Sequence, residues 1–232
     1  MSKFYRLLLV GAPGVGKGTY SVRAATALQC AAISSGDLLR KEVTNKTEIG
    51  KKLQSMIEGG VLVPDEIISG MVASHLKELK QSNQFPGGYI LDGYPRNVNQ
   101  AKTLWDSKEI QVDHVINLTQ PRNVIVTKLS SRRCCADCGF VYNCAKINEG
   151  GIVMDPLMPK TEGVCDKCGS TKPLVTRKDD QLDVVEKRQS EYEALATPLL
   201  EFYESKRILH NFEVLGGTKV YLPKLLDLIK SL

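Results

Sequence analysis

The apolar positions of the chain form short runs separated by stretches with helical spacing. Residues 5–10 are largely apolar and run into Gly11, a pattern that predicts a buried strand, a glycine loop and then a helix to about Leu28. Helical patterns separate further strand candidates at residues 31–34, 88–92, 114–118 and 208–214. Because strands that alternate with helices form parallel βαβ units with right-handed crossovers, the chain is predicted to have an α/β fold.

Prolines mark several of the predicted helix boundaries. Pro64 is followed by two acids, which predicts a helix start, because proline fits the first turn and acids favour the positive end of the helix dipole. Pro121 predicts a second start, with a helix that runs to about Arg133. The last long helix is expected over residues 183–205, with a kink at Pro198.

Two segments break the alternation of strands and helices. Residues 34–63 are charged and helical in pattern, and we interpret them as a helical insert. Residues 134–176 are rich in Gly, Pro and Cys, with short strand candidates at residues 141–142 and 152–154. The second segment is predicted to be a small inserted subdomain.

Composition and charge narrow the class of protein. The chain is 42% hydrophobic and 25% charged, as is typical of a globular protein, and its net charge is +5. The basic residues are spread along the chain, which disfavours a nucleic-acid binder and suits a small polyanionic substrate. No apolar run approaches the roughly 20 residues of a membrane span, and no targeting segment is recognised. We therefore expect a cytosolic protein.

The first glycine cluster has the composition of a phosphate-binding loop. The segment reads Gly11-Ala-Pro-Gly-Val-Gly-Lys-Gly-Thr19. Its glycines let the backbone turn tightly and point N–H groups inward, while Lys17 brings a positive charge and the following helix adds its dipole. A glycine turn without a ligand is the alternative, and the order of strand, loop and helix disfavours it.

One position in this loop departs from the general pattern. That pattern places Ser or Thr directly after the lysine as a Mg²⁺ ligand, whereas here Gly18 follows Lys17 and Thr19 comes one residue later. The ion is then expected to be held by phosphates and waters. Asp92 ends a neighbouring predicted strand and is expected to act through those waters.

Six of the seven cysteines lie in the second insert, and four of them form two C-x2-C pairs. The pairs are Cys135 with Cys138 and Cys165 with Cys168, the pattern of a tetrahedral structural zinc site with no open position. Their separation exceeds the usual ribbon spacing, so the residues between them are expected to form a hairpin. Reduced thiols without metal, and iron in place of zinc, are the alternatives. The remaining cysteines are not expected to be ligands: Cys30, as a small core residue, Cys134 and Cys144.

Histidines and tryptophan carry no predicted chemistry. Trp105 is expected to pack on a helix. The histidines lack ligand or base spacing and are expected to be structural or surface residues: His75, His114 and His210.

The glycine loop resembles the phosphate loop of adenylate kinases, and three further blocks match that family at the expected separations. Ile33-Ser-Ser-Gly-Asp-Leu-Leu-Arg40 resembles its AMP-site segment. Leu91-Asp-Gly-Tyr-Pro-Arg96 resembles its DGFPR signature, with Tyr94 in place of Phe. Thr176-Arg-Lys-Asp-Asp180 resembles the segment that returns from the lid. The resemblance spans nearly the whole chain.

The resemblance implies a P-loop NTPase fold, a three-layer α/β/α core with a central parallel five-stranded sheet. The core would comprise residues 1–33, 64–130 and 177–232, with a helical AMP-binding insert over residues 34–63 and a small zinc-ribbon-like β lid over residues 131–176. The implied reaction is reversible transfer of the γ-phosphoryl of ATP to AMP, giving two ADP, with Mg²⁺ on the nucleotide and structural Zn²⁺. The expected partners are small nucleotides alone, without nucleic acid or membrane, and the expected state is a cytoplasmic monomer.

The resemblance also implies roles for individual residues. The catalytic group would comprise Lys17, Asp92, Arg96, Arg132, Arg177 and Arg188. The ATP site would comprise Gly11, Gly14, Val15, Gly16, Lys17, Gly18, Thr19, Lys128 and Arg132. The AMP site would comprise Ser35, Arg40, Leu62, Val63, Gly93, Arg96, Gln100, Arg177 and Arg188. Asp179 would help to position the arginines when the lid closes.

Arginine suits this chemistry apart from any family. Phosphoryl transfer needs in-line positioning and charge stabilisation, and the guanidinium fork binds phosphate oxygens in pairs and stays protonated. Each arginine also has a plain structural interpretation. Arg132 and Arg133, for example, are expected at a helix C-terminus, where cations are favoured. Only together with the motif blocks does the functional interpretation prevail.

The choice of donor base stays open. In related enzymes an arginine often lies at the position of Lys128 and stacks on the base, and lysine has no planar group to stack. Lys128 and Arg132 are expected on one face of one helix. A GTP:AMP phosphotransferase is therefore an alternative. A UMP/CMP kinase is disfavoured by the long lid, and a non-catalytic zinc-ribbon adaptor on a P-loop scaffold by the charged residues, which it would not need.

Overall fold

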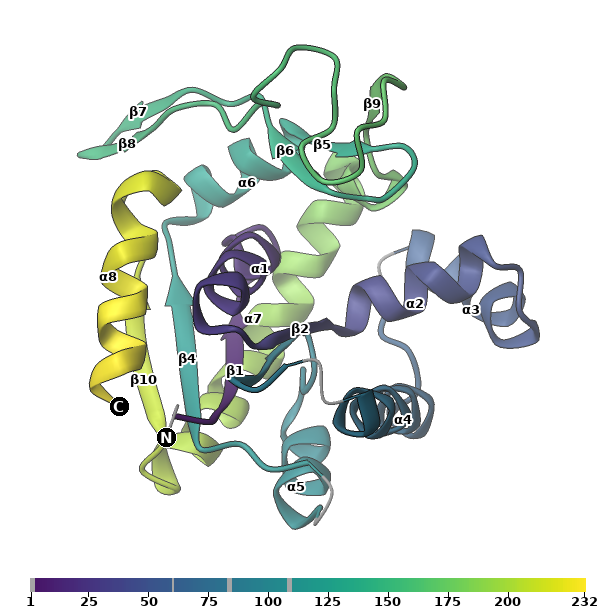
Figure 1. Cartoon of the computed structure of the whole chain (residues 1–232), viewed down its shortest axis with the longest axis vertical. Helices are drawn as coiled ribbons and strands as arrows, with labels where there is room; N and C mark the ends of the chain where they lie inside the picture. The colour runs from purple at the N-terminus through teal and green to yellow at the C-terminus, as the bar shows by residue number, and fades with distance from the viewer. Residues whose placement is uncertain (1–2, 60, 83–84, 108–109) are drawn as a thin grey trace.

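A five-stranded parallel sheet forms the centre of the protein in the computed structural model, which describes residues 3–59, 61–82, 85–107 and 110–232. The strand order is β10-β4-β1-β3-β2, and helices cover both faces (Figure 1). The strands are β1 (Tyr5–Gly11), β2 (Ala31–Ser34), β3 (Gly88–Asp92), β4 (His114–Thr119) and β10 (Leu209–Glu213). The predicted α/β fold with a parallel five-stranded sheet is confirmed.

Alternate side chains of the central strand enter two separate hydrophobic cores. Leu7 and Leu9 pack into one core and Leu8 and Val10 into the other, because successive side chains of a strand point to opposite faces. The first core includes residues of α1 (Lys17–Leu28), α6 (Arg122–Ser130) and α8 (Thr218–Ser231). The second includes residues of α4 (Asp65–Ser82), α5 (Val98–Asp106) and α7 (Leu182–Ser205). The result is the predicted three-layer arrangement.

The first insert is a pair of helices, α2 (Ser35–Thr44) and α3 (Glu48–Glu58). Ser34 caps α2 by accepting from the Asp37 N–H at 3.3 Å. In Figure 1 this pair projects from the β2 edge of the sheet, beside α4. The helical pattern predicted for residues 34–63 is confirmed within the described part of that range, outside which Gly60 lies.

The second insert contains two small antiparallel sheets. One has the order β6-β5-β9, and the other is a hairpin of β7 and β8. The strands are β5 (Arg132–Cys135), β6 (Val141–Asn143), β7 (Ile147–Glu149), β8 (Ile152–Met154) and β9 (Leu174–Val175). A 3-10 turn, η1 (Lys178–Asp180), leads back into α7. The strand candidates at 141–142 and 152–154, and a hairpin between the two cysteine pairs, are confirmed.

The prediction that the helix after Pro121 continues to Arg133 is wrong. α6 ends at Ser130, and Arg132 begins β5, where it pairs with Asn143 of β6. The Cys144 N–H donates to the Ser131 carbonyl at 3.0 Å, so the returning chain takes over backbone groups that a longer helix would use. Lys128 and Arg132 therefore do not share a helix face.

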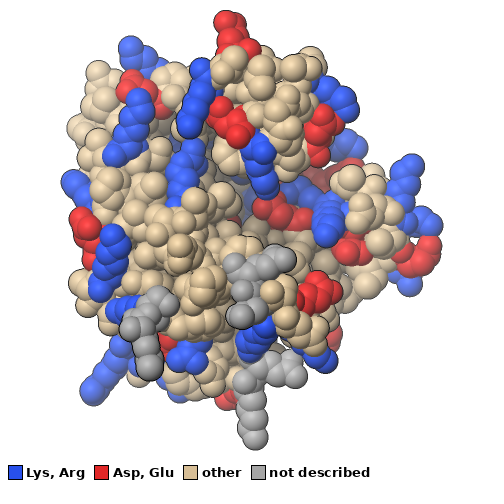
Figure 2. Space-filling view, in the orientation of Figure 1, with Lys and Arg blue, Asp and Glu red and all other residues tan. Residues whose placement is uncertain are grey.

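The other helix boundaries agree with the prolines. α4 begins at Asp65 after Pro64, and α6 begins at Arg122 after Pro121. Pro198 lies inside α7, and the kink there stays a prediction. In the part of the chain that the structure describes, no helix has the length and apolar character required to cross a membrane. Figure 2 shows Lys and Arg scattered among Asp and Glu over the face drawn, in keeping with the dispersed basic residues of the sequence.

Candidate active site

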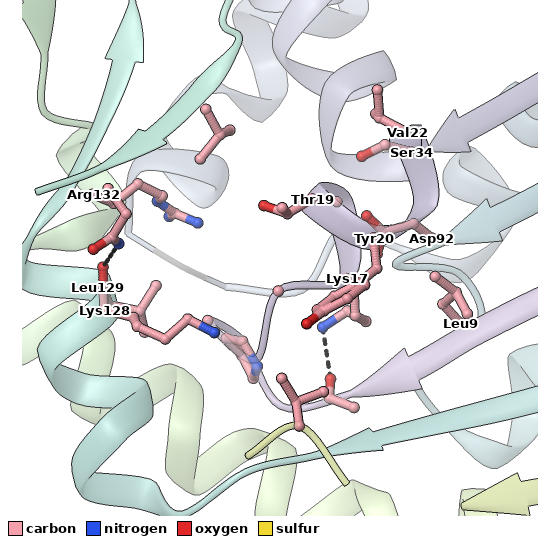
Figure 3. A pocket seen from close by; sticks show the side chains of 18 of the residues that line it. Leu9, Lys17, Thr19, Tyr20, Val22, Ser34, Asp92, Lys128, Leu129 and Arg132 are labelled. Carbon is pink, nitrogen blue, oxygen red and sulfur yellow. Dashed lines mark hydrogen bonds between the residues drawn. The ribbon is translucent and has the colours of Figure 1, made fainter. Parts of the chain in front are cut away.

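The glycine loop joins β1 to α1 at the carboxyl edge of the sheet. Gly11, Gly14 and Gly16 have backbone φ angles of 139°, 89° and 116°, values that residues other than glycine rarely adopt. A Cβ on Gly14 would lie 2.6 Å from Cγ of Leu129 in α6, so this glycine also permits close packing. Lys17 folds back over the loop, and its Nζ donates to the Gly11 carbonyl at 2.6 Å and to the Ala12 carbonyl at 3.0 Å (Figure 3). Backbone and side chain thus have the arrangement that the predicted anion cradle requires.

Lys17 and Asp92 lie close enough to influence each other. Burial lowers the pKa of Lys17 to about 8, an effect that Asp92 opposes and the surrounding arginines reinforce. Burial raises the pKa of Asp92, while Lys17 opposes that shift. A Cβ on Gly18 would lie 3.4 Å from Oδ2 of Asp92, so the start of α1 faces this carboxylate directly. Among the described residues, none forms an ion pair with Asp92, which leaves its oxygens available for water or a cation.

The side chain of Lys128 is hydrogen-bonded to the backbone of the glycine loop. Its Nζ donates to the Val15 carbonyl and to Oε1 of Gln120, both at 2.8 Å. Figure 3 shows its side chain extending from α6 toward the loop. Burial lowers the pKa of Lys128 to about 7, with a smaller effect of Lys17 in the same direction. The lysine therefore supports the loop backbone, a role that the sequence did not indicate.

A cavity of about 610 Å³ opens above the loop. It is lined by nearly every residue predicted for the ATP site, namely Gly11, Gly14, Gly16, Lys17, Gly18, Thr19, Lys128 and Arg132. Val15 is the exception, because its side chain is buried and its N–H donates to the Ala12 carbonyl at 3.2 Å. The same cavity reaches the β7–β8 hairpin and the turn that precedes α8.

A smaller cavity of about 50 Å³ adjoins it beside α2. Its lining includes eight of the nine residues predicted for the AMP site: Ser35, Arg40, Leu62, Val63, Gly93, Arg96, Gln100 and Arg188. The ninth, Arg177, lines the larger cavity. Oγ of Ser35 is buried and has no hydrogen-bond partner among the described residues. This hydroxyl is therefore available to a ligand, although three other buried polar atoms among the described residues, on Tyr20, Asn117 and Tyr203, also lack a partner.

Arg96 and Gln100 are held by backbone and side-chain bonds around the second cavity. Nε of Arg96 donates to the Gly93 carbonyl at 2.8 Å, which leaves the end of its guanidinium toward the cavity. The side chain is open to the cavity yet surrounded by protein, and this desolvation lowers its pKa to about 10. Gln100 accepts from the Arg96 N–H at 2.7 Å and donates to Oδ1 of Asp65 at 2.6 Å. Asp65 thus fixes the amide orientation of Gln100.

Three arginines from separate segments converge where the lid returns to the core. Nε of Arg132 donates to Oδ2 of Asp180 at 2.7 Å, and a second bond makes the pair bidentate.

Nη1 of Arg188 contacts Oδ2 of Asp179 at 2.7 Å, as the predicted role of Asp179 requires. Nε of Arg177 donates to Sγ of Cys134 at 3.0 Å. All three arginines line the larger cavity.

The AMP-site arginine on α2 is paired within its own helix. Arg40 forms an ion pair with Asp37, one turn before it. Burial would raise the pKa of Asp37, but the charge and hydrogen bond of Arg40 outweigh it and hold that pKa below its usual value. Asp37 and Arg40 both line the larger cavity.

Four cysteines converge at the tip of the second insert. The Sγ atoms of Cys135, Cys138, Cys165 and Cys168 all lie within 4.8 Å of one another. The Sγ–Sγ distances are 3.7 Å for Cys135 with Cys168 and 3.6 Å for Cys138 with Cys165. Four thiolates about 2.3 Å from a tetrahedral zinc ion are separated by about 3.8 Å, so the group fits the metal. Cys134 and Cys144 are outside this group and Cys30 is buried in the core, as predicted.

Comparison with known proteins identifies the family. The sequence model of the adenylate kinase family matches residues 9–208. The chain belongs to the adenylate kinase family. It is therefore a phosphotransferase. Among similar proteins, adenylate kinase 1, chloroplastic, of Arabidopsis thaliana is 38% identical over 229 residues, which are 96% of this chain and 77% of the relative.

Bacterial members of the adenylate kinase family are equally similar. The adenylate kinase of Thermoanaerobacter sp. (strain X514) is 36% identical over 211 residues, 90% of each chain. That of Caldicellulosiruptor saccharolyticus is 38% identical over 208 residues, 88% of this chain and 89% of the relative.

The partners of the site residues are what sequence reasoning missed. Asp180 pairs with Arg132, Asp65 with Gln100, and Gln120 with Lys128. Of these three partners, Asp180 was the easiest to find from the sequence, because it adjoins the predicted Asp179 in the segment that returns from the lid.

Proposed function

We propose that the protein transfers the γ-phosphoryl group of ATP to AMP and so forms two molecules of ADP. The observation that carries this proposal is that two adjoining cavities share a set of cations. One cavity contains the glycine loop and the other contains the unpaired Ser35 hydroxyl, while both are lined by Arg40, Arg96 and Arg188. Two phosphorylated ligands that meet end to end fit this arrangement.

On the donor side, the loop amides and the N-terminus of α1 bind the triphosphate. Lys17 brings a positive charge to the β- and γ-phosphates, and its proximity to Asp92 helps to keep it charged. Thr19 and Gly18 line the same region of the cavity. Arg132 faces the transferred group from β5.

On the acceptor side, Arg96 grips the AMP phosphate and Arg40 assists from α2. The base lies toward Gln100 and the backbone near Leu62 and Val63. Gly93 keeps this cavity open, because a Cβ there would lie 2.7 Å from Oγ of Ser35.

At the point of transfer, Arg132, Arg177 and Arg188 stabilise the charge that develops on the phosphoryl oxygens. Asp179 and Asp180 hold two of them in place. Each guanidinium has five N–H groups, so a carboxylate and a phosphate can be bound together. Positioning and charge stabilisation of this kind supply most of the catalysis in phosphoryl transfer. The acceptor oxygen of AMP is already anionic, so no strong base is required.

Two metal ions are part of this proposal. Asp92 has free carboxylate oxygens facing Gly18, which fits a hydrated Mg²⁺ that arrives with the nucleotide. That ion neutralises phosphate charge when bound. The four cysteines at the lid tip fit a structural Zn²⁺, which stabilises a segment too small to bury a core of its own.

The division into moving parts is likewise proposed. Residues 1–33, 64–130 and 177–232 act as the core, residues 34–63 as the AMP-binding insert and residues 131–176 as the lid, whose β7–β8 hairpin packs on the core. Closure of the two inserts would exclude water from the phosphoryl group. We further propose that the protein acts as a monomer in the cytoplasm.

A coupled assay with ATP, AMP and Mg²⁺ tests the function. ADP formation is expected, and its absence at millimolar substrates would refute the proposal. GTP in place of ATP, and UMP or CMP in place of AMP, define specificity in the same assay. GTP:AMP phosphotransfer is the second candidate, because Lys128 is bound to Val15 and Gln120 and presents no planar cation to a donor base.

A further inference from the structure

The β7–β8 hairpin lies within the lid insert in sequence but packs on the core in space. Ile147, Ile152 and Met154 are 5%, 3% and 8% exposed and belong to the same hydrophobic core as β1 and α8. The Gly217 N–H donates to the Val153 carbonyl at 3.2 Å. In Figure 1 the hairpin lies over the start of α8, away from strands β5 and β9. The hairpin therefore forms a fixed edge of the larger cavity.

Three residues of this hairpin line the larger cavity, Ile147, Val153 and Met154, and of these only Val153 is exposed. Val153 is 59% exposed, although its two neighbours are buried, because alternate residues of a strand point to opposite sides. Val153 lines the larger cavity together with Val220, which is 57% exposed in the first turn of α8. Gly216 and Gly217, which precede α8, add no side chain to this end of the cavity, while Asp155, Thr218 and Lys219 also line it. This end is thus open and has exposed apolar side chains beside polar ones.

The cation expected at this end is bound elsewhere. Lys128 donates to Val15 and Gln120, and Nε2 of Gln120 in turn donates to the Val214 carbonyl at 2.7 Å. Gln120 therefore links the glycine loop, through Lys128, to the turn that leads into α8. A base bound at this end meets aliphatic side chains where a planar cation would otherwise cover it.

We propose that Val153 determines affinity for the donor nucleotide by packing against the ring face of its base, and that Gln120 is the positioning residue that keeps Lys128 on the glycine loop. The proposal rests on the proposed function for the identity of the donor. A flat aromatic base matches an apolar wall, because its ring face carries no hydrogen-bonding groups. The contact involves the face of the base and not its edge, so ATP and GTP gain equally from it.

Val153→Ala tests the proposed contact of Val153 with the donor base, and Val175→Ala is the matched control. Val175 is a valine of the same insert, 45% exposed, and lies outside the residues that line the cavity. Loss of two methyl groups from a contact with the base is expected to raise the KM and the Kd for ATP about 3- to 10-fold. The KM for AMP and kcat should change less than about twofold, and the control should match the wild type.

The possible outcomes separate this proposal from the proposed function. Unchanged ATP affinity in Val153→Ala, an equal rise in the KM for AMP, or the same effect in Val175→Ala would overturn it. ATP binding measured by calorimetry does not depend on turnover. If the wild-type protein bound ATP but formed no ADP, and Val153→Ala bound ATP more weakly, the contact of Val153 with the base would be supported and only the kinase activity would be refuted.

Gln120→Ala and Gln120→Glu test the positioning role. Glutamate retains an acceptor for Lys128, whereas alanine does not. The KM for ATP is expected to rise several-fold in Gln120→Ala and to be largely rescued in Gln120→Glu, with the KM for AMP unchanged in both. A lower melting temperature with unchanged KM values would show a purely structural role and overturn the assignment.

Discussion

The side chain with the most direct predicted role at the donor phosphates is Lys17, which donates to two loop carbonyls within the described part of the chain. Lys17→Ala is expected to lower kcat/KM for ATP by about 10²–10³-fold, because it removes a positioned charge from a low-dielectric site. The fold should persist, since burial already disfavours this cation. Steady-state kinetics and circular dichroism measure the two effects, and a near-normal rate would refute the role. Arg96→Ala should behave alike with AMP as the varied substrate.

Asp180 tests how the arginines are held. Its side chain is 1% exposed, and it forms a bidentate pair with Arg132, whose side chain is 15% exposed. Asp180→Asn is expected to lower kcat and to lower the free energy of unfolding by about 1–3 kcal/mol, because a guanidinium is left without its counter-charge. Asp137→Asn is the control, because Asp137 pairs with Lys172 on the surface and its loss should alter neither quantity measurably. Equal behaviour of both variants would contradict the positioning role.

A histidine pair predicts a dependence of stability on pH. Nδ1 of His114 lies 3.2 Å from Nε2 of His210, on adjacent parallel strands. Burial and His210 lower the pKa of His114, Lys3 adds to that shift, and Asp113 opposes it. Since the folded pKa lies below the unfolded value of about 6.5, the unfolded state binds the proton more readily. At high pH, where His114 is uncharged in both states, it does not change the free energy of unfolding. Stability is lost as the pH falls through the unfolded pKa and then the folded pKa of His114.

The measurement is chemical denaturation between about pH 8 and pH 5, a range that brackets the unfolded pKa. His114→Asn should lose less stability over this range than the wild type. His75→Asn is the control, because His75 lies on α4, apart from the pair. Parallel curves for wild type and His114→Asn would contradict the assignment.

At the scale of elements, the cysteine group ties the two ends of the lid sheet together. Cys135 ends β5, while Cys165 and Cys168 precede β9. Removing the metal with a chelator is expected to lower the temperature of the first thermal unfolding transition. It is also expected to raise the KM for ATP, because β5 carries Arg132. Cys138→Ser should have the same effect, and Cys144→Ser should not, since Cys144 lies outside the group. Elemental analysis that finds neither zinc nor iron in the native protein would end the proposal.

Elements defined by local patterns were predictable, whereas those that depend on distant pairing were not. The apolar runs of β1, β3 and β4 and the proline at the start of α4 locate these elements within one residue. The end of α6 was missed because it is set by pairing of β5 with β6, which helix periodicity does not reveal. The same holds in the site. Glycines and arginines carry motif signals, but the pairing of Gln120 with Lys128 and Val214 depends on the tertiary fold.

At the scale of the whole molecule, the AMP-binding insert contacts the core next to the point where the lid returns. Nζ of Lys178, in η1 just after the lid, contacts Oε1 of Glu58 in α3 at 2.9 Å. Both side chains are substantially exposed, so the pair contributes little to stability and is easily exchanged for water. The contact is therefore compatible with motion of both inserts, while the buried hairpin side chains hold β7 and β8 on the core.

This division predicts distinct hydrogen-exchange behaviour within one continuous insert. Amides of β7 and β8 should be protected without nucleotide, because their side chains share the hydrophobic core with α8. Amides of β5 and β6 should gain protection when ATP binds, and those of α2 and α3 when AMP binds. Exchange measured by mass spectrometry with each ligand alone and with both together resolves the three groups. If β7 and β8 exchanged as fast as β5 and β6 in the free protein, residues 131–176 would move as one body, and the fixed wall inferred for the donor base would be lost with it.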